Sequence, residues 1–118
     1  MGDVEKRQHH RFMALLDVRA LPGERIPSDL RLATIDIAAG GARCASNRPL
    51  DAGLLLKLTF TLVGGNLREP ATIDVEATVL RCLERPASIE SRRYEAALQF
   101  THIDAEDRRR LLSYLNTL

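Results

Sequence analysis

Hydrophobic and polar residues alternate along most of this chain, in short runs separated by turn residues. The alternating runs are 12–20, 56–62, 73–82 and 94–100, and 30–37 and 42–45 are two further strand candidates. A period of two is the pattern of a β-strand with one buried face. Glycine and proline pairs such as Pro22-Gly23 and Gly64-Gly65 separate the runs and indicate turns. The pattern therefore predicts about six short antiparallel strands.

The run at 73–82 changes phase before its end. Ile73, Val75, Ala77 and Val79 alternate with polar residues, but the next apolar residue is Leu80. A slip of one residue moves all later side chains to the other face unless the strand bends. We therefore expect a β-bulge or a sharp barrel bend near Leu80.

The end of the chain has a different period. Asp104 and Asp107 are placed as an N-cap and an acidic first turn, and Leu111, Leu112 and Leu115 form a one-sided stripe. These residues predict an amphipathic helix at about 104–117, with the three leucines in the core. Short strands followed by one helix indicate a mostly β protein, a small closed barrel that the helix plugs or flanks.

Composition sets limits on this plan. A length of 118 residues fits one domain, and with no tryptophan its core must be mostly aliphatic. The net charge of +1 provides no overall field that would attract a nucleic-acid polymer or an anionic membrane. Any site for an anion must therefore come from a local cluster of side chains.

Cysteines and the N-terminus indicate a reducing, cytoplasmic setting. Cys44 and Cys82 lie in apolar runs without CxxC spacing, so we expect two buried, reduced thiols. The N-terminal residues are charged and no apolar run approaches the roughly 18–20 residues of a membrane span, so we expect no signal peptide and no membrane insertion. His9 and His10 are adjacent, which disfavours a metal site, and we expect no cofactor.

Two short segments carry the candidate chemistry. Residues 1–11 are mostly polar and show no periodic apolar pattern, so we expect a flexible arm. Within it, Arg7 and Arg11 are four residues apart. About 25 residues later, Asp36 begins the sequence Asp-Ile-Ala-Ala-Gly-Gly, which ends at Gly40 and Gly41. The pair resembles the RxxxR and [D/N]xSxxG signatures of the PilZ domain family, and it departs from them at Ala38, where the family usually has serine.

The resemblance covers nearly the whole chain, because residues 94–104 also resemble the last strand of that family running into its helix. It implies a six-stranded antiparallel PilZ-type β-barrel with a C-terminal α-helix over 12–118, preceded by the arm at 1–11. It also implies a bacterial receptor for the second messenger cyclic di-GMP. Arg7 and Arg11 would grip this ligand, Asp36 would bind a guanine edge, and Ala38, Gly40 and Gly41 would lie beside it.

These residue types suit such a ligand. A guanidinium fork meets guanine N7 and O6 together or pairs with phosphate, and a carboxylate accepts the guanine N1–H and N2–H groups. Glycines let the backbone turn and let a ligand approach closely. Ala38 lacks one hydroxyl, and the loss of one hydrogen bond predicts about two- to tenfold weaker binding. Protonation of His9 and His10, near pH 6.5, is a further hypothesis for stronger anion binding.

We therefore expect a cyclic di-GMP receptor that orders its arm on binding and relays the signal to a separate, unidentified effector protein. The resemblance implies outputs in motility, chemotaxis, exopolysaccharide or biofilm control. The alternative is a PilZ-fold interaction module with weak or lost ligand binding, as some family members are. An enzyme is not expected, because no nucleophile motif, metal cluster or P-loop is present. Monomer and homodimer both stay open, as do one and two ligands per site.

Overall fold

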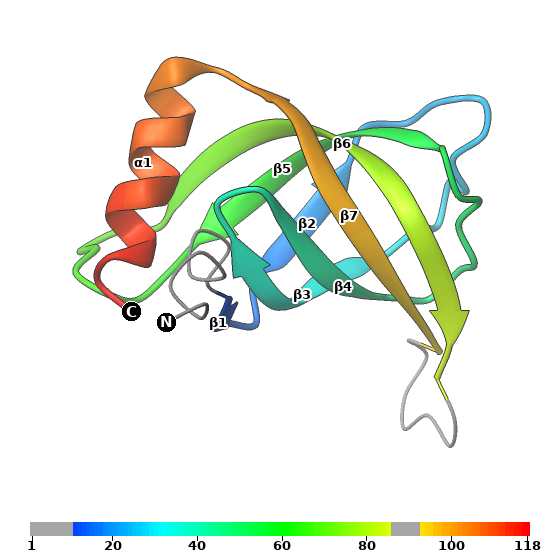
Figure 1. The fold of residues 1–118 in the computed structure, drawn as a ribbon, viewed down its shortest axis with the longest axis horizontal. Helices are drawn as coiled ribbons and strands as arrows, with labels where there is room; N and C mark the ends of the chain where they lie inside the picture. The colour runs from blue at the N-terminus through cyan, green and yellow to red at the C-terminus, as the bar shows by residue number, and fades with distance from the viewer. Residues whose placement is uncertain (1–10, 86–92) are drawn as a thin grey trace, which may run out of the picture.

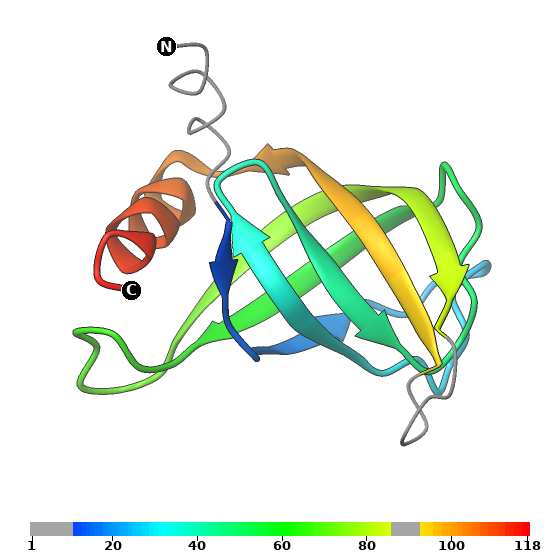
Figure 2. The same cartoon turned by 60° about the horizontal axis from the view of Figure 1, so that its bottom comes forward.

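Six strands close into a ring in the computed structural model, which describes residues 11–85 and 93–118 (Figures 1 and 2). The ring order is β2–β3–β4–β7–β6–β5 and back to β2, and every pairing is antiparallel. The strands are β2 (Asp17–Ala20), β3 (Leu32–Ala38), β4 (Gly41–Ser46), β5 (Leu55–Leu62), β6 (Ala71–Glu84) and β7 (Tyr94–Ile103). The predicted six-stranded barrel with a C-terminal helix is confirmed. The predicted arm falls on residues that lie outside the described ones, apart from Arg11.

The first predicted strand, 12–20, is wrong as a single element. It is divided into β1 (Phe12–Met13) and β2, and both pair with β3. Between them the hydroxyl of Thr34 accepts the Leu16 N–H at 2.7 Å and donates to the Ala14 carbonyl oxygen. The Thr34 hydroxyl thus bonds to two backbone groups that would otherwise pair with a neighbouring strand. The pairing of β3 with β4 also shifts register between Thr34 and Asp36. Alternation predicted the buried face correctly but not this interruption.

The expected irregularity near Leu80 is present. Val79 pairs with Leu98 and Arg81 pairs with Ala97, so Leu80 is the extra residue of a bulge. Its side chain is exposed. The bulge lets β6, which has 14 residues, bend around the barrel while it pairs with β5 and β7.

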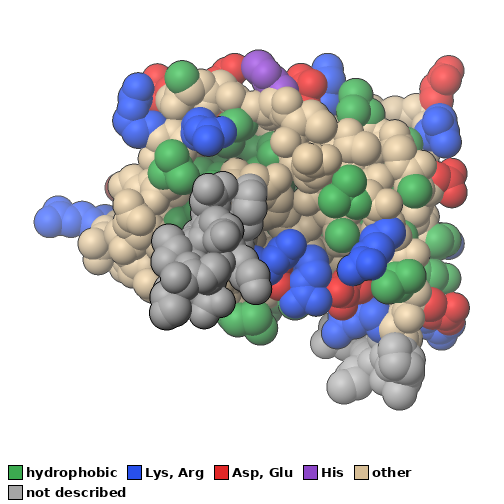
Figure 3. Space-filling model, viewed as in Figure 1, with side chains coloured by type: hydrophobic (Ala, Val, Ile, Leu, Met, Phe, Trp, Pro, Cys, Tyr) green, Lys and Arg blue, Asp and Glu red, His purple; other side chains and the backbone are tan. Residues whose placement is uncertain are grey.

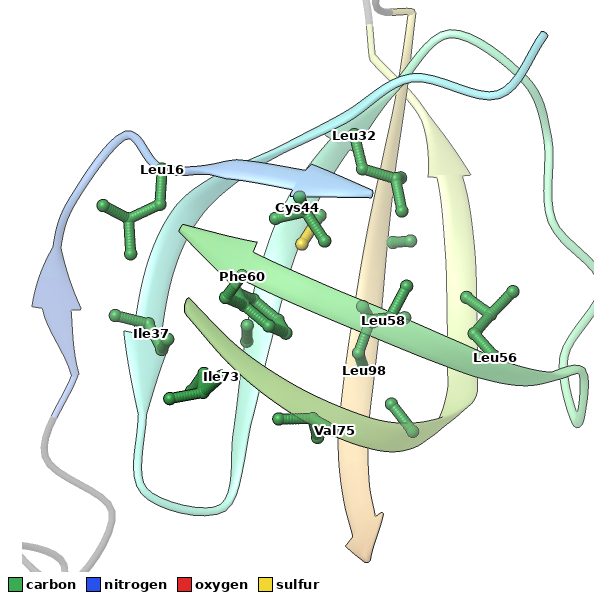
Figure 4. Close-up of a cluster of buried hydrophobic side chains, with 14 of the residues drawn as sticks. Leu16, Leu32, Ile37, Cys44, Leu56, Leu58, Phe60, Ile73, Val75 and Leu98 are labelled. Atoms are coloured by element: carbon green, nitrogen blue, oxygen red, sulfur yellow. The ribbon is translucent and has the colours of Figure 1, made fainter. Parts of the chain in front are cut away.

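The core lies inside the ring and is mostly aliphatic, as the composition predicts. Figure 4 shows Leu58 and Phe60 of β5 in the same interior cluster as Ile73 of β6 and Leu98 of β7. Phe60 also meets Phe100 edge to face, with ring centroids 5.6 Å apart. Each strand contributes alternate residues to this interior, and burial of their apolar surface is the main stabilising term.

Helix α1 (Ala105–Leu115) covers the end of the barrel at which the β3–β4 turn lies (Figures 1 and 2). Leu111 and Leu115 are buried as predicted, but Leu112 is exposed and Tyr114 takes its place, with its hydroxyl donating to the Val63 carbonyl at 2.7 Å. At 100° per residue, Leu112 and Tyr114 lie on opposite sides of the Leu111–Leu115 stripe, each about 80° from its midline, and the Tyr114 side is the one that packs on the barrel. Asp104 is the N-cap residue, but its side chain makes no capping hydrogen bond.

The two cysteines are free and differ in burial. Cys44 is completely buried, and burial raises the pKa of its thiol to about 12, so it stays protonated. Cys82 is only partly buried, which corrects the expectation of two buried thiols. It follows the Leu80 bulge and pairs with Ala96, two residues before the end of β6. Among the residues that the structure describes, no helix has the length and apolar character to cross a membrane.

Candidate functional site

A tight hairpin between β3 and β4 presents the second predicted motif. Ala38 pairs with Gly41 around the two-residue turn, Ile37 pairs with Ala42, and Asp36 pairs with Arg43. Paired residues share a face of a sheet and successive residues alternate. Ile37 therefore points into the barrel, where it is fully buried, while Asp36 and Arg43 lie together on the outer face.

The Asp36 carboxylate is held between two arginines. Arg11 Nη1 donates to Oδ1 at 2.7 Å, Arg43 Nε donates to Oδ2 at 2.7 Å, and Arg43 Nη2 forms an ion pair with Oδ2 at 2.5 Å. The Asp36 side chain is only 2% exposed, although it lies on the outer face. In Figure 3, basic and acidic side chains gather on this face over the position of β4.

Electrostatics keep this buried carboxylate ionised. Burial alone would raise the pKa of Asp36, but hydrogen bonds and positive charge from Arg43 and Arg11 outweigh it and lower the pKa below its usual range. The same contacts raise the pKa of Arg43, chiefly through its hydrogen bonds to Asp36. The site is thus a fixed negative group enclosed by positive ones.

A second carboxylate extends this arrangement. Arg43 Nη1 donates to Glu95 Oε2 on β7 at 2.9 Å, so Arg43 bridges two acids on different strands. We call the four residues Arg11, Asp36, Arg43 and Glu95 the Asp36 cluster. It joins the start of the described chain to β3, β4 and β7.

The glycines and Ala38 shape the turn. A Cβ at Gly41 would collide with the backbone carbonyl oxygen of Leu98, so only glycine lets β4 lie this close to β7. The Gly40 carbonyl accepts the Phe100 N–H at 2.9 Å, which ties the turn to the same strand. Ala38 is buried beside Gly41. A hollow of about 240 Å³, lined in part by Ala39, Gly40 and Arg108, lies next to this turn.

The structure thus brings most of the predicted site residues together. Arg11 contacts Asp36, and Ala38, Gly40 and Gly41 belong to the same hairpin. Arg7 lies outside the described residues. The sequence reasoning missed Arg43 and Glu95. Arg43 had a signal, because a two-residue turn at 39–40 pairs position 36 with position 43, but Glu95 depends on the nonlocal β4–β7 register.

The described residues form neither an Asp36–His102 pair nor a metal site, and the three arginines at 108–110 do not form one basic patch. His102 Nε2 lies 3.3 Å from Asp104 Oδ1, whereas the Asp36 carboxylate contacts Arg11 and Arg43, so Asp36 and His102 do not form a pair. Within 11–85 and 93–118, no three side chains of histidine, cysteine, aspartate or glutamate are grouped as metal ligands. The basic run 108–110 is divided: Arg110 pairs with Glu106 and Asp107, while Arg108 lines the hollow beside Gly40.

Comparison with known proteins gives a consistent result. The family model described as PilZ domain matches residues 5–117. A solved structure, the Bacillus subtilis inhibitor of motility (MotI/DgrA), superposes with a TM-score of 0.71 and 31% sequence identity. The match covers 92% of this chain and 48% of that chain, so this chain spans about half of that protein. No curated protein matches the sequence. The family match over nearly the full length, with the barrel and hairpin described above, shows that the chain belongs to the PilZ domain family.

Proposed function

We propose that this protein is a cyclic di-GMP receptor whose ligand site is the outer face of the β3–β4 hairpin together with the arm at 1–11. The observation that carries the proposal is the 2.7 Å contact between Arg11 and Asp36. These residues come from two motifs that are 25 positions apart, and each has the chemistry that a guanine nucleotide requires. Their meeting on one surface supports a common ligand.

In this proposal, Arg11 changes partner when the ligand binds. Asp36 is nearly inaccessible while Arg11 covers Oδ1, but the Arg11 side chain is itself 53% exposed. The Arg11 guanidinium can turn toward a phosphate or a guanine edge, because both accept its N–H groups. Oδ1 of Asp36 then becomes available to the guanine N1–H and N2–H groups. Arg7 acts beside Arg11, and Ala38, Gly40 and Gly41 give the ligand a close approach to the backbone.

The shape of the surface supports a role for the arm. The hollow at Gly40 has a volume of about 240 Å³, whereas sites that enclose a drug-sized ligand occupy about 300–1,000 Å³. A dinucleotide of two guanosines would therefore lie on the outer face rather than inside a cavity. Residues 1–11 cover it in this proposal, and the ordering of the arm is the signal passed to a separate effector protein. Similarity to MotI/DgrA, an inhibitor of motility, favours motility as the output.

Calorimetric titration of cyclic di-GMP into the protein tests the proposal. We expect saturable binding that is lost in the double variant Arg7→Ala/Arg11→Ala and kept in Arg48→Ala, which removes an arginine just beyond the open end of the hairpin. No heat at protein concentrations far above micromolar, confirmed by equilibrium dialysis, would reject the receptor.

A second candidate is a protein-interaction module of the same fold. It is favoured by Ala38, which lacks the family's hydroxyl, and by the internal contacts that already occupy Asp36. In that case the Asp36 cluster serves only to hold the hairpin. The same titration separates the two functions, since the interaction module binds no nucleotide.

A further inference from the structure

We propose that Arg43, which neither motif includes, is a positioning residue: it holds the Asp36 carboxylate in place for the ligand once Arg11 has left it. This inference rests on the proposed receptor function. It assigns different roles to the two arginines that contact the same carboxylate.

The contacts of the two arginines are unequal. Arg11 makes one contact, to Oδ1, and lies at the start of the described chain. Arg43 lies within β4, donates to Oδ2 from Nε, forms an ion pair with Oδ2 through Nη2, and donates from Nη1 to Glu95. A guanidinium bound on both sides by acids from neighbouring strands has little freedom to move. Arg43 is therefore the fixed partner and Arg11 the exchangeable one.

The different roles of Arg11 and Arg43 leave Oδ1 of Asp36 free to accept from the ligand. A carboxylate has about four acceptor positions on its two oxygens. Arg43 uses Oδ2 alone, so departure of Arg11 opens Oδ1 while Oδ2 stays anchored. An anchored carboxylate presents its free oxygen in one orientation, which lowers the entropic cost of binding the guanine edge. Arg43 acts through Asp36 and does not need to contact the ligand.

Arg43 also determines the charge of Asp36 in the bound state. Arg11 and Arg43 contact Asp36 directly, Glu95 lies behind Arg43, and the buried Cys44 thiol is near enough for the charge of Asp36 to affect it. The Cys44 pKa of about 12 keeps that thiol neutral, so it does not contribute a charge. Without Arg43, and with Arg11 on the ligand, burial would act on Asp36 with little opposition and raise its pKa. The carboxylate would then protonate in mild acid and lose acceptor capacity.

The test is titration of cyclic di-GMP at about pH 8 and about pH 5.5 into the wild type, Arg43→Gln and Arg48→Gln. The measured quantity is the ratio of the variant's Kd to the wild-type Kd at each pH, in which any titration of His9 and His10 cancels. We expect Arg43→Gln to bind about tenfold more weakly at the higher pH, with a ratio that grows further at the lower pH. Arg48→Gln, which breaks the exposed Arg48–Asp29 pair, should keep a ratio near one at both.

A ratio for Arg43→Gln that stays near one, or that is the same at both pH values, would overturn the inference. Absence of wild-type binding would instead reject the receptor function itself. If Arg43→Gln lacks the circular dichroism spectrum of the wild type, Glu95→Ala carries the test, because it removes the acceptor on the other side of Arg43 and leaves both Arg43–Asp36 contacts in place. A smaller loss in Glu95→Ala, similar at both pH values because the Arg43 charge remains beside Asp36, supports the positioning role, and unchanged affinity contradicts it.

Discussion

Two arginine–aspartate pairs lie at opposite ends of the β3–β4 hairpin. Arg43 pairs with Asp36 beside its turn, and Arg48 pairs with Asp29 just beyond its open end. Both are close, with N···O distances of 2.5 Å. Their surroundings differ, because the Asp29 and Arg48 side chains are 54% and 52% exposed whereas Asp36 is 2% exposed. Both aspartates have a lowered pKa, with hydrogen bonds from their arginines among the causes. Geometry and pKa direction alone therefore do not separate the two pairs, and burial does.

Burial changes what each pair can do. An exposed pair is screened by water and salt, so it contributes little to stability and can be broken at little cost. A buried carboxylate depends on its partners, because loss of one leaves charge without compensation. The Asp36 cluster is therefore a place where a ligand that replaces one partner makes a large energetic difference.

The largest expected effect is on folding stability. Arg43→Ala should lower the free energy of unfolding by about 2–3 kcal/mol, less than a fully buried pair would lose, because Arg43 is 38% exposed and Arg11 remains. Arg48→Ala should give a change too small to resolve. Urea unfolding followed by circular dichroism measures both. Equal losses in the two variants would show that burial of Asp36 does not distinguish the pairs.

Even one added methyl group at the turn end of the hairpin should lower the stability of the protein. Gly41→Ala should cost about 1–3 kcal/mol, since its methyl group would meet the rigid Leu98 carbonyl oxygen. Gly23→Ala is the control, because its methyl group would meet only the flexible end of Ile26 at 3.2 Å. Thermal unfolding compares them. A Gly41→Ala protein as stable as Gly23→Ala would contradict the close β4–β7 approach.

A smaller effect should appear in acid. The pKa of Asp36 is lowered in the folded state, so its contribution to stability is present above the unfolded pKa of about 3.9 and is lost as pH falls through the folded value. The stability difference between the wild type and Asp36→Asn should therefore shrink below about pH 4. Urea unfolding at several pH values measures this difference. A difference independent of pH would mean that Asp36 is not preferentially ionised in the folded protein.

Ala38→Ser should give the smallest change, and it acts on the ligand. Restoring the hydroxyl that the family signature contains should tighten cyclic di-GMP binding by about two- to tenfold, the value of one ordinary hydrogen bond. Calorimetry at constant pH measures it, with Ala39→Ser in the turn as a matched control. Equal tightening of cyclic di-GMP binding in both variants would contradict the prediction, because the effect would then not depend on the position at which the family has serine.

The sequence predicted the barrel because strands such as β5 show their buried face through local alternation, as Phe60 and its neighbours do. It also located Asp36 and Arg11, through motifs that depend only on spacing. It did not predict the break between β1 and β2, which depends on the Thr34 hydroxyl from another strand. Nor did it predict the Arg43–Glu95 contact, which requires the register of β4 on β7. What was missed are tertiary hydrogen bonds and registers, which local patterns do not encode.

The most direct test is a backbone ¹H–¹⁵N NMR titration with cyclic di-GMP. We expect saturable shift changes at Arg11, at the hairpin turn from Asp36 to Arg43 and in residues 1–10, with little change at Asp29 and Arg48. A spectrum unchanged at excess ligand, or shift changes confined to the Asp29–Arg48 end, would contradict this expectation.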